Sequence, residues 1–337
     1  MKPTSRITIR DVAATAGVSV ATVSKVLNAR YGVSAATSAH VQAVIRELGY
    51  EASLVAQSLR NHKTNVIGIL VADLEPFSTE LLKGAAKAIK GTGYELVVYS
   101  AGGRTSDHAG WEQRYLSRLS GTLVDGAVLV TPTVVEVDFG QAVVAVDPHT
   151  GPTGLPTVDS DNLAGARTGV RHLLDLGHRR IALIGGRPDL ESAKLREQGY
   201  CELRAAGIPV DPLLIQPGNY DADDSTAAAR RLLESPDRPT ALFAANDISA
   251  IAAIEVAVAM GLRVPEDLSV VGFDNVPEAA LARPPLTTVE QPIHEMGHRA
   301  IDLLIQLMHG EQTHDTHIRL STRLVVRQST APVGRGT

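Results

Sequence analysis

The chain has 337 residues, of which 44% are apolar, 20% charged and 4% aromatic. This composition predicts a globular protein with a large core and excludes a disordered chain, and the length favours about two or three domains. A membrane-spanning helix is excluded because the best apolar run, residues 248–260, is short and contains Glu255. The single cysteine, Cys201, excludes a disulfide framework and a cysteine metal cluster, and residues 1–10 lack the apolar core of a secretory signal. We therefore expect a cytoplasmic protein.

Charge is distributed unevenly along the chain. Residues 1–63 contain eight Lys or Arg and three Asp or Glu, a net charge of +5, and the remaining residues carry −10. A basic head on an acidic body predicts that one end of the protein meets a polyanion.

The head carries three short helical patterns. Thr8 is a good N-cap for a first helix that ends at Gly17, and Ser19 caps a second helix over residues 20–28. The tight, glycine-containing link between them is typical of a helix-turn-helix. Ser34 caps a third helix that ends at Gly49. Apolar side chains of the three helices are expected to bury one another, namely Ile9, Val12, Ala13, Val23, Val26, Leu27, Val41, Val44, Ile45 and Leu48.

A three-helix bundle without a DNA role would show the same spacing, so the exposed face of the second helix decides between the two interpretations. Short hydroxyl side chains let a helix lie close to phosphates, and a long lysine can then reach a guanine edge in the major groove. The face consists of Ser19, Ala21, Thr22, Ser24, Lys25 and Asn28. This pattern favours DNA binding.

The run ITIRDVAATAGVSVATVSKVLN at residues 7–28, followed by VS at 33–34 and ELGY at 47–50, resembles the headpiece of the lac repressor (LacI/GalR) family of bacterial transcription regulators. The resemblance implies that Val20, Ala21 and Lys25 read bases. It places phosphate contacts at Thr8, Ser19, Thr22, Ser24 and Asn28. Because Val20 and Ala21 lack hydrogen-bonding groups, they would read by apolar contact, for example with a thymine methyl group.

Residues 51–64 join the head to the first apolar strand. The pattern alone is that of a linker, whereas the resemblance implies a hinge helix that enters the minor groove beside its dimer mate and wedges Leu59 between base pairs. A helix of about seven residues is too short to be stable alone, so it would order only against DNA and its twin. Ser53 and Gln57 stand where the family usually has Asn and Arg, and Ala52 replaces Pro.

The body alternates strands and helices. Strands are predicted at 66–72, 96–99, 126–130, 142–146, 181–186, 213–216, 241–245 and 268–273, with helices at 81–89, after Asn162, and from Ser192, Asp223 and Asp247. This alternation predicts an α/β fold with two doubly wound parallel sheets, in which ligands bind at the carboxyl ends of the strands.

No catalytic or cofactor motif accompanies these strands. Neither GxGxxG nor GxxxxGK[ST] follows a strand, since the GG pairs at 102–103 and 185–186 are too short, and no nucleophile elbow occurs. His172 and His178 lack a clear metal spacing, and His309, His314 and His317 lie in a polar connection. We therefore expect no enzyme activity, no cofactor and no metal site.

Polar and aromatic residues follow the strands instead, at Asp73, Phe77, Ser78, Asp147, Arg196, Tyr220, Asn246, Asp247 and Asp274. Singly, an Asp or Asn in such a place is typical of a helix cap. Together, across both halves, they suit a sugar, whose hydroxyls form paired hydrogen bonds and whose C–H faces stack on rings.

The family resemblance continues through VDSDN, LGHRRIALIGG, FAANDISAIAAI, VPEDLSVVGFDN and PPLTTVEQP, and implies a body similar to periplasmic sugar-binding proteins. It implies effector contacts at Phe77, Ser78, Asp147, Arg196, Tyr220, Asn246 and Asp274, with Asp161 and Gln291 as further candidates. Glu75 departs from the family's usual Asn-Pro-Phe, which would alter the ligand.

The sequence thus predicts a helix-turn-helix DNA-binding domain at 1–50, a hinge helix and linker at 51–64, an effector-binding and dimerisation domain of two α/β subdomains at 65–330, and a tail at 331–337. It predicts a sequence-specific repressor that binds a palindromic operator in double-stranded DNA and responds to a small effector, a sugar or oligosaccharide. A homodimer is expected because no heptad-bearing helix follows the body. Two alternatives stay open, control by a protein coregulator and a sugar-binding transport protein.

Overall fold

The computed structural model describes residues 7–27, 31–50, 63–102, 111–119, 123–133, 139–152, 154–311 and 316–333. The chain divides into two compact units, Met1–Thr64 with Gly121–Leu123, and Asn65–Ser120 with Val124–Thr337. Within the described ranges, no helix is both long and apolar enough to cross a membrane.

The first unit contains the three predicted helices, α1 (Ile9–Thr15), α2 (Val20–Leu27) and α3 (Ala35–Leu48). Their N-terminal caps form as the sequence predicts, whereas the first helix ends at Thr15, before the predicted Gly17. The Asp11 carboxylate accepts hydrogen bonds of 2.7 Å from both the backbone N–H and the hydroxyl of Thr8. The Ser19 and Ser34 hydroxyls each accept a 3.1 Å bond from the backbone N–H three residues later. These bonds satisfy orphan groups of the first turns.

A small apolar core holds the three helices together. Val12, Val23 and Val41, one from each helix, are completely buried. Leu27 was predicted to point inward, and this is wrong, because 37% of it is exposed. Leu27 is the last residue of α2, and it lies outside the face of the helix on which Val23 and Val26 are buried.

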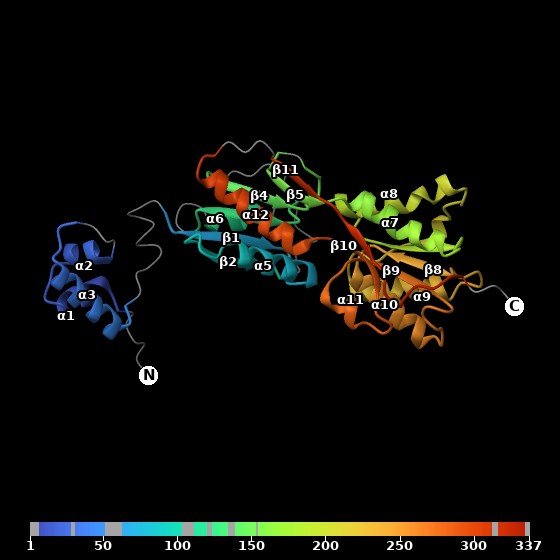
Figure 1. The fold of residues 1–337 in the computed structure, drawn as a ribbon, viewed down its shortest axis with the longest axis horizontal. Coiled ribbons are helices and arrows are strands. Elements are labelled where there is room, and N and C mark those ends of the chain that lie inside the picture. Colours follow the sequence, from blue (N-terminus) through green and yellow to red (C-terminus); the bar gives the residue numbers. More distant parts are fainter. Residues whose placement is uncertain are drawn as a thin grey trace. The chain divides into compact units, whose positions relative to one another are not determined.

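The second unit begins with a six-stranded parallel sheet. Its order is β11 (His317–Leu320), β5 (Thr157–Ser160), β4 (Ala142–Val146), β3 (Gly126–Val130), β1 (Val66–Val71) and β2 (Glu95–Ser100). Alternate residues of β1 point to opposite faces. Ile67 and Ile69 pack on α5 (Pro76–Ala88) and α12 (Ile293–Met308), whereas the position of Gly68 faces Leu119 of α6 (Trp111–Leu119). Both faces of the sheet are therefore covered (Figure 1).

Helices α5 and α12 approach each other very closely. A Cβ atom on Gly84 would lie 2.0 Å from the His294 carbonyl oxygen, and one on Gly297 would lie 2.2 Å from the Leu81 carbonyl oxygen. Only glycine fits at these two contacts, which hold α5 closely against α12.

The second sheet has the order β12 (Arg323–Val325), β10 (Thr287–Glu290), β9 (Ser269–Asp274), β8 (Ala241–Ala244), β6 (Ile181–Gly185) and β7 (Ile215–Pro217). Its strands pair in parallel, except that β12 runs antiparallel to β10. Ala182 and Ile184 pack toward α9 (Ala222–Leu233) and α10 (Asp247–Ala259). Ile181 and Leu183 pack on the other face toward α7 (Asn162–Asp175) and α8 (Glu191–Cys201), as Figure 1 shows.

The chain crosses between the two sheets three times, after β5, after β10 and after β11. Residues at the ends of strands from both sheets consequently lie close together where the chain passes from one sheet to the other. This architecture confirms the predicted α/β class with two largely parallel sheets and a helix-turn-helix head.

Several elements were not predicted, namely α6, α11 (Pro277–Leu281), α12, β5, β10, β11 and β12. The strand predicted at 213–216 is shifted, because a 3₁₀ turn at Pro212–Leu214 precedes β7. His317 was placed in a polar connection and instead begins β11, where its Nε2 lies 2.9 Å from the Asp159 carboxylate.

Candidate functional site

In the first unit, the predicted DNA-contacting residues lie on the outer face of the helix-turn-helix. Thr8, Ser19, Val20, Ala21 and Lys25 are exposed, and Thr22 and Ser24 are half-buried. The Ser19 and Thr22 hydroxyls are 2.9 Å apart and bond to each other. Asn28 and Leu59 lie outside the described residues. The face of α2 thus presents one cation among small side chains, as a major-groove helix requires.

In the second unit, a cavity of about 440 Å³ opens at the carboxyl ends of strands from both sheets. This volume lies in the range of small-molecule sites. Its lining includes all seven predicted effector contacts, Phe77, Ser78, Asp147, Arg196, Tyr220, Asn246 and Asp274, and also Gln291. Asp161 does not line it, because its carboxylate caps α7 by accepting from the Ala164 N–H.

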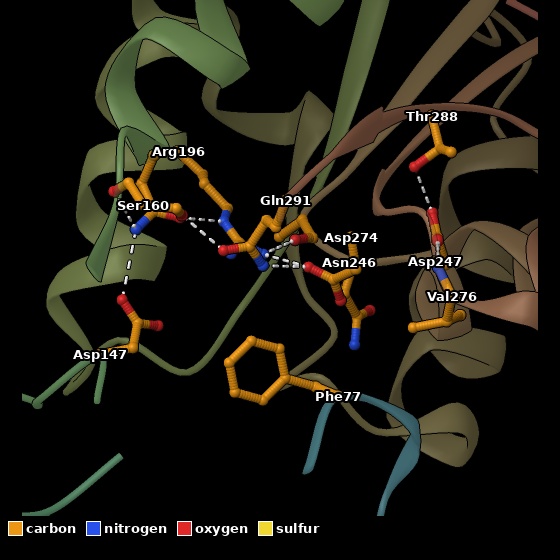
Figure 2. A network of polar contacts seen from close by, with 12 residues as sticks. Phe77, Asp147, Ser160, Arg196, Asn246, Asp247, Asp274, Val276, Thr288 and Gln291 are labelled. Atoms are coloured by element: carbon orange, nitrogen blue, oxygen red, sulfur yellow. Dashed lines mark hydrogen bonds and ion pairs between the residues drawn. The ribbon is translucent and has the colours of Figure 1, made fainter. Parts of the chain in front are cut away.

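Arg196 is the centre of a buried polar network in the cavity floor (Figure 2). Its Nε donates to Asn162 Oδ1 at 2.9 Å, and its Nη1 donates to the Ala245 carbonyl oxygen and to Asp274 Oδ1 at 3.3 Å. Asn162 in turn donates to Asp147 at 3.4 Å. The Arg196 guanidinium also lies 3.8 Å from the ring centre of Phe273, a cation–π contact.

Gln291 extends this network to the first sheet. Its Nε2 donates to Asp274 at 2.6 Å, and its Oε1 accepts from the Ser160 hydroxyl at the end of β5. Gln291 and Ser160 stand at two of the three crossings between the sheets. The floor of the cavity therefore ties the two subdomains together where they join.

The opposite wall comes from the first turn of α5. In Figure 2 the ring of Phe77 faces Arg196 and Asp274 from this side. Ser78 was predicted to contact a ligand, yet its hydroxyl donates to the Glu75 carboxylate, which also accepts from the backbone N–H groups of Phe77 and Ser78. Glu75 lines the cavity beside them.

Tyr220 and Asn246 complete the aromatic and polar lining. Tyr220 stacks directly on Gly186, since a Cβ atom there would lie 2.2 Å from the Tyr220 ring carbon Cζ. Its Oη is buried without a hydrogen-bond partner among the described residues. Asn246 caps α10 through a 3.0 Å bond from the Ser249 N–H. The adjacent Asp247 is not among the residues that line the cavity, and its carboxylate accepts hydrogen bonds from the Thr288 hydroxyl and the Val276 N–H.

Backbone strain concentrates in the cavity wall. Seven non-glycine residues among those described have positive φ angles, and five of them line the cavity, namely Thr131 (47°), Asp147 (47°), Asn219 (53°), Tyr220 (62°) and Asp274 (114°). Such conformations cost free energy and cluster at ligand sites, where the surrounding packing maintains them.

The cavity carries more carboxylates than cations. Burial raises the pKa of the Asp274 carboxyl to about 7, although Arg196 opposes the shift. Burial likewise raises the pKa of Asp147 and of Glu75. The site is thus rich in hydrogen-bond acceptors and poor in free positive charge.

The sequence missed other residues of the lining, among them Thr131, Arg187, Ser192, Asn219, Asp221, Ile248 and Val276. Thr131 directly follows β3 and Arg187 closely follows β6. The rule that ligands bind at strand ends would have found both. Across the described ranges, no group of His, Cys, Asp and Glu is arranged to hold a metal ion.

Both parts of the chain match known families. Residues 8–53 match bacterial regulatory proteins of the lacI family, and residues 170–330 match the periplasmic binding protein-like domain. The chain is 37% identical to the HTH-type transcriptional regulator CelR of Thermobifida fusca, over 98% of this chain and 100% of that protein. It is 32% identical to the HTH-type transcriptional repressor CytR of Escherichia coli K12, over 98% of both.

Solved structures agree with this relationship. The CelR–cellobiose complex is 36% identical with a TM-score of 0.70, covering 96% of this chain and 100% of that one. The lac repressor dimer bound to operator and the anti-inducer ONPF is 29% identical with a TM-score of 0.81, covering 96% of this chain and 99% of that one. The chain therefore belongs to the lacI family of bacterial regulatory proteins and is a DNA-binding transcriptional regulator, not an enzyme.

Proposed function

We propose that this regulator represses transcription by binding a palindromic operator as a dimer in the cytoplasm, with the outer face of α2 in the major groove, and that a sugar or oligosaccharide in the cavity controls it. The observation that carries the proposal is the convergence of seven residues, chosen from separate stretches of sequence, on one cavity of about 440 Å³.

The chemistry of the cavity suits a sugar. Carboxylate and amide oxygens of Asp147, Asn246 and Asp274 supply acceptors for hydroxyl groups. The Phe77 and Tyr220 rings offer flat apolar surfaces for C–H faces of a pyranose. The CelR complex with cellobiose supports the same ligand class for this relative of CelR.

The proposed dimer is supported by the relationship to the lac repressor, which was solved as a dimer bound to operator and is 29% identical to this chain.

Ligand binding in the cavity can change DNA binding through the segments that join the two subdomains. A ligand that contacts both Phe77 on the first subdomain and Arg196 on the second would favour one relative arrangement of the two subdomains. In a dimer, that arrangement sets the distance between the two predicted hinges at 51–64, whose Leu59 lies outside the described residues. Coupling of this type changes DNA affinity by about 1 to 3 kcal/mol.

Two linked measurements test the proposal. Thermal unfolding of the purified protein is followed with a panel of mono- and oligosaccharides, since a ligand at 100 times its Kd stabilises by about 2.7 kcal/mol. Fluorescence anisotropy with duplex DNA selected from a random library then tests whether the stabilising sugar changes DNA affinity. If DNA binds and no sugar raises the unfolding temperature, the sugar effector is wrong and a protein coregulator takes its place.

A further inference from the structure

The first turn of α5 forms one wall of the cavity, and its N-terminus is occupied by the protein's own carboxylate. Glu75 is the N-cap, and its Oε2 accepts from the Phe77 N–H at 2.6 Å while its Oε1 accepts from the Ser78 N–H at 2.9 Å and from the Ser78 hydroxyl. Proline at position 76 has no N–H group to add. The backbone N–H groups of Phe77 and Ser78, the donors at this helix N-terminus, are thus already hydrogen-bonded to a carboxylate of the protein itself.

An open helix N-terminus is a ready site for a phosphate, because its free N–H groups and its dipole favour an anion. In this chain a phosphate would have to displace Glu75 from α5. Two other helix N-termini at the wall, those of α9 and α10, are also capped by side chains, whereas α8 and α11, whose N-cap residues Leu190 and Val276 line the cavity as well, have no side-chain cap. Asp221 accepts from the Asp223 and Asp224 N–H groups of α9, and Asn246 caps α10.

The cations of the lining are also already paired. Arg187 Nη2 lies 2.7 Å from the Asp189 carboxylate, and Arg196 is bound to Asp274. No other Lys or Arg lines the cavity in the described part of the chain. A ligand phosphate would therefore face carboxylates without a free cation to neutralise it, and like charges brought together disfavour binding.

We propose that Glu75 makes this cavity select uncharged polyhydroxyl ligands over their phosphate esters, so that the effector is the free sugar. The inference rests on the proposed sugar effector for the choice of ligand, and on the Glu75 contacts for the selectivity. Glu75 is then a specificity-determining residue, because it fills the anion position of α5 and leaves acceptors that suit hydroxyl donors.

The electrostatics of the neighbouring groups agree. Burial raises the pKa of Glu75, and the Asp73 charge raises it further. The charge of Glu75 in turn contributes to the raised pKa of Asp274. A cavity in which burial and neighbouring carboxylates disfavour a negative charge also disfavours a negatively charged ligand.

The test compares matched ligands on three variants and the wild type, by thermal unfolding and isothermal titration calorimetry. The probes are free monosaccharides, their 6-phosphate esters, free disaccharides and inorganic phosphate. Glu75→Gln keeps the shape of the cap and removes its charge, and Glu75→Ala opens the N–H groups. Glu80→Gln is the control, because Glu80 lies on the same helix but binds Lys83 and His294 away from the cavity lining.

We expect a free monosaccharide to bind the wild type at least about tenfold more tightly than its phosphate ester, a difference of about 1.4 kcal/mol. Glu75→Gln should narrow this gap, and Glu80→Gln should retain it. Equal affinity of the wild type for the two ligands would overturn the inference, as would an unchanged gap in Glu75→Gln. A cooperative unfolding transition and a circular dichroism spectrum like those of the wild type verify that each variant has folded.

Inorganic phosphate keeps the inference testable if the sugar proposal fails. Should no sugar, free or phosphorylated, bind the wild type, the sugar effector is wrong. Stabilisation of Glu75→Ala by phosphate, without an effect on the wild type or Glu80→Gln, would still support the role of Glu75. An equal response of the wild type and Glu75→Ala would refute it.

Discussion

The guanidinium of Arg196 lies 3.3 Å from the carboxylate of Asp274, and only 4% and 9% of the two side chains are exposed. Two charges buried in this way are held by each other and by the hydrogen bonds that surround them. Removing one partner leaves the other buried without compensation, which is costly.

Arg196→Ala should therefore lower the free energy of unfolding. Broken buried ion pairs cost about 3 to 5 kcal/mol, and we expect about 3 kcal/mol because water in the cavity can reach the Asp274 carboxylate. Effector binding should be lost while operator affinity is retained. Chemical denaturation measures the first effect and fluorescence anisotropy the second.

Arg263→Ala is the matched control for this variant. Arg263 pairs with Asp267 at 2.9 Å, but 70% of its side chain is exposed, so solvent screens the pair. Its loss should change stability little. Equal destabilisation by the two substitutions would show that burial of the Arg196–Asp274 pair has no energetic consequence.

Stability should depend on pH through Asp274. The pKa of this carboxyl is raised from 3.8 to about 7 in the folded protein. Its protonation therefore stabilises the fold fully below about pH 3.8, and this contribution is lost as the pH rises through about 7. Asp274→Asn cannot ionise, so between about pH 5 and 8 it should lose less stability than the wild type.

The contribution of His149 to stability changes with pH in the direction opposite to that of Asp274. It therefore serves as a comparison in the same denaturation experiments. Burial lowers its pKa from 6.5 to about 4. Its contribution to stability is present above about pH 6.5 and is lost as the pH falls toward about 4, so His149→Gln should flatten the acid side of the profile. Parallel pH profiles for the wild type and Asp274→Asn would contradict the assignment of Asp274.

Gly186→Ala should weaken effector binding with little change in fold. Its Cβ atom would lie 2.2 Å from Tyr220 Cζ and would push the ring into the cavity. We expect a loss of about tenfold in affinity, or about 1.4 kcal/mol, by calorimetry. At Gly185 the nearest atom to a new Cβ is 3.8 Å away, so Gly185→Ala should bind like the wild type. If Gly185→Ala and Gly186→Ala lose the same effector affinity, displacement of the Tyr220 ring is not the cause.

Lys25→Ala should cost about 1 to 3 kcal/mol on a selected operator and less on random DNA, because base readout is lost along with one charge. Anisotropy titrations on the two DNAs measure the difference. Arg46→Ala, which removes an exposed cation from the last turn of α3, should not alter specificity. If Lys25→Ala weakens both complexes equally, Lys25 is a phosphate contact only.

Local sequence was sufficient wherever neighbours along the chain decide the structure. The apolar runs at Gly126–Val130 and Ala142–Val146 form strands with the predicted bounds, and Ser34 caps α3 as expected. Seven predicted effector contacts line one cavity because the carboxyl ends of parallel strands share an edge. The missed helix α12 has an amphipathic pattern, but its docking on α5 depends on Gly84 and Gly297, far apart in sequence.

The direction of single side chains within the cavity was decided by the tertiary structure. Asn246 and Asp247 are adjacent, yet Asn246 lines the cavity while Asp247 turns to Thr288 and Val276. Ser78 lies at the predicted place, but its hydroxyl binds Glu75. The sequence by itself determined the buried strands β1, β3, β4, β6, β8 and β9, the N-caps of the three head helices and the family of this regulator, because those depend on residue type and spacing. Only the tertiary structure decided which polar group faces a ligand, because burial forces each one to satisfy the nearest available partner.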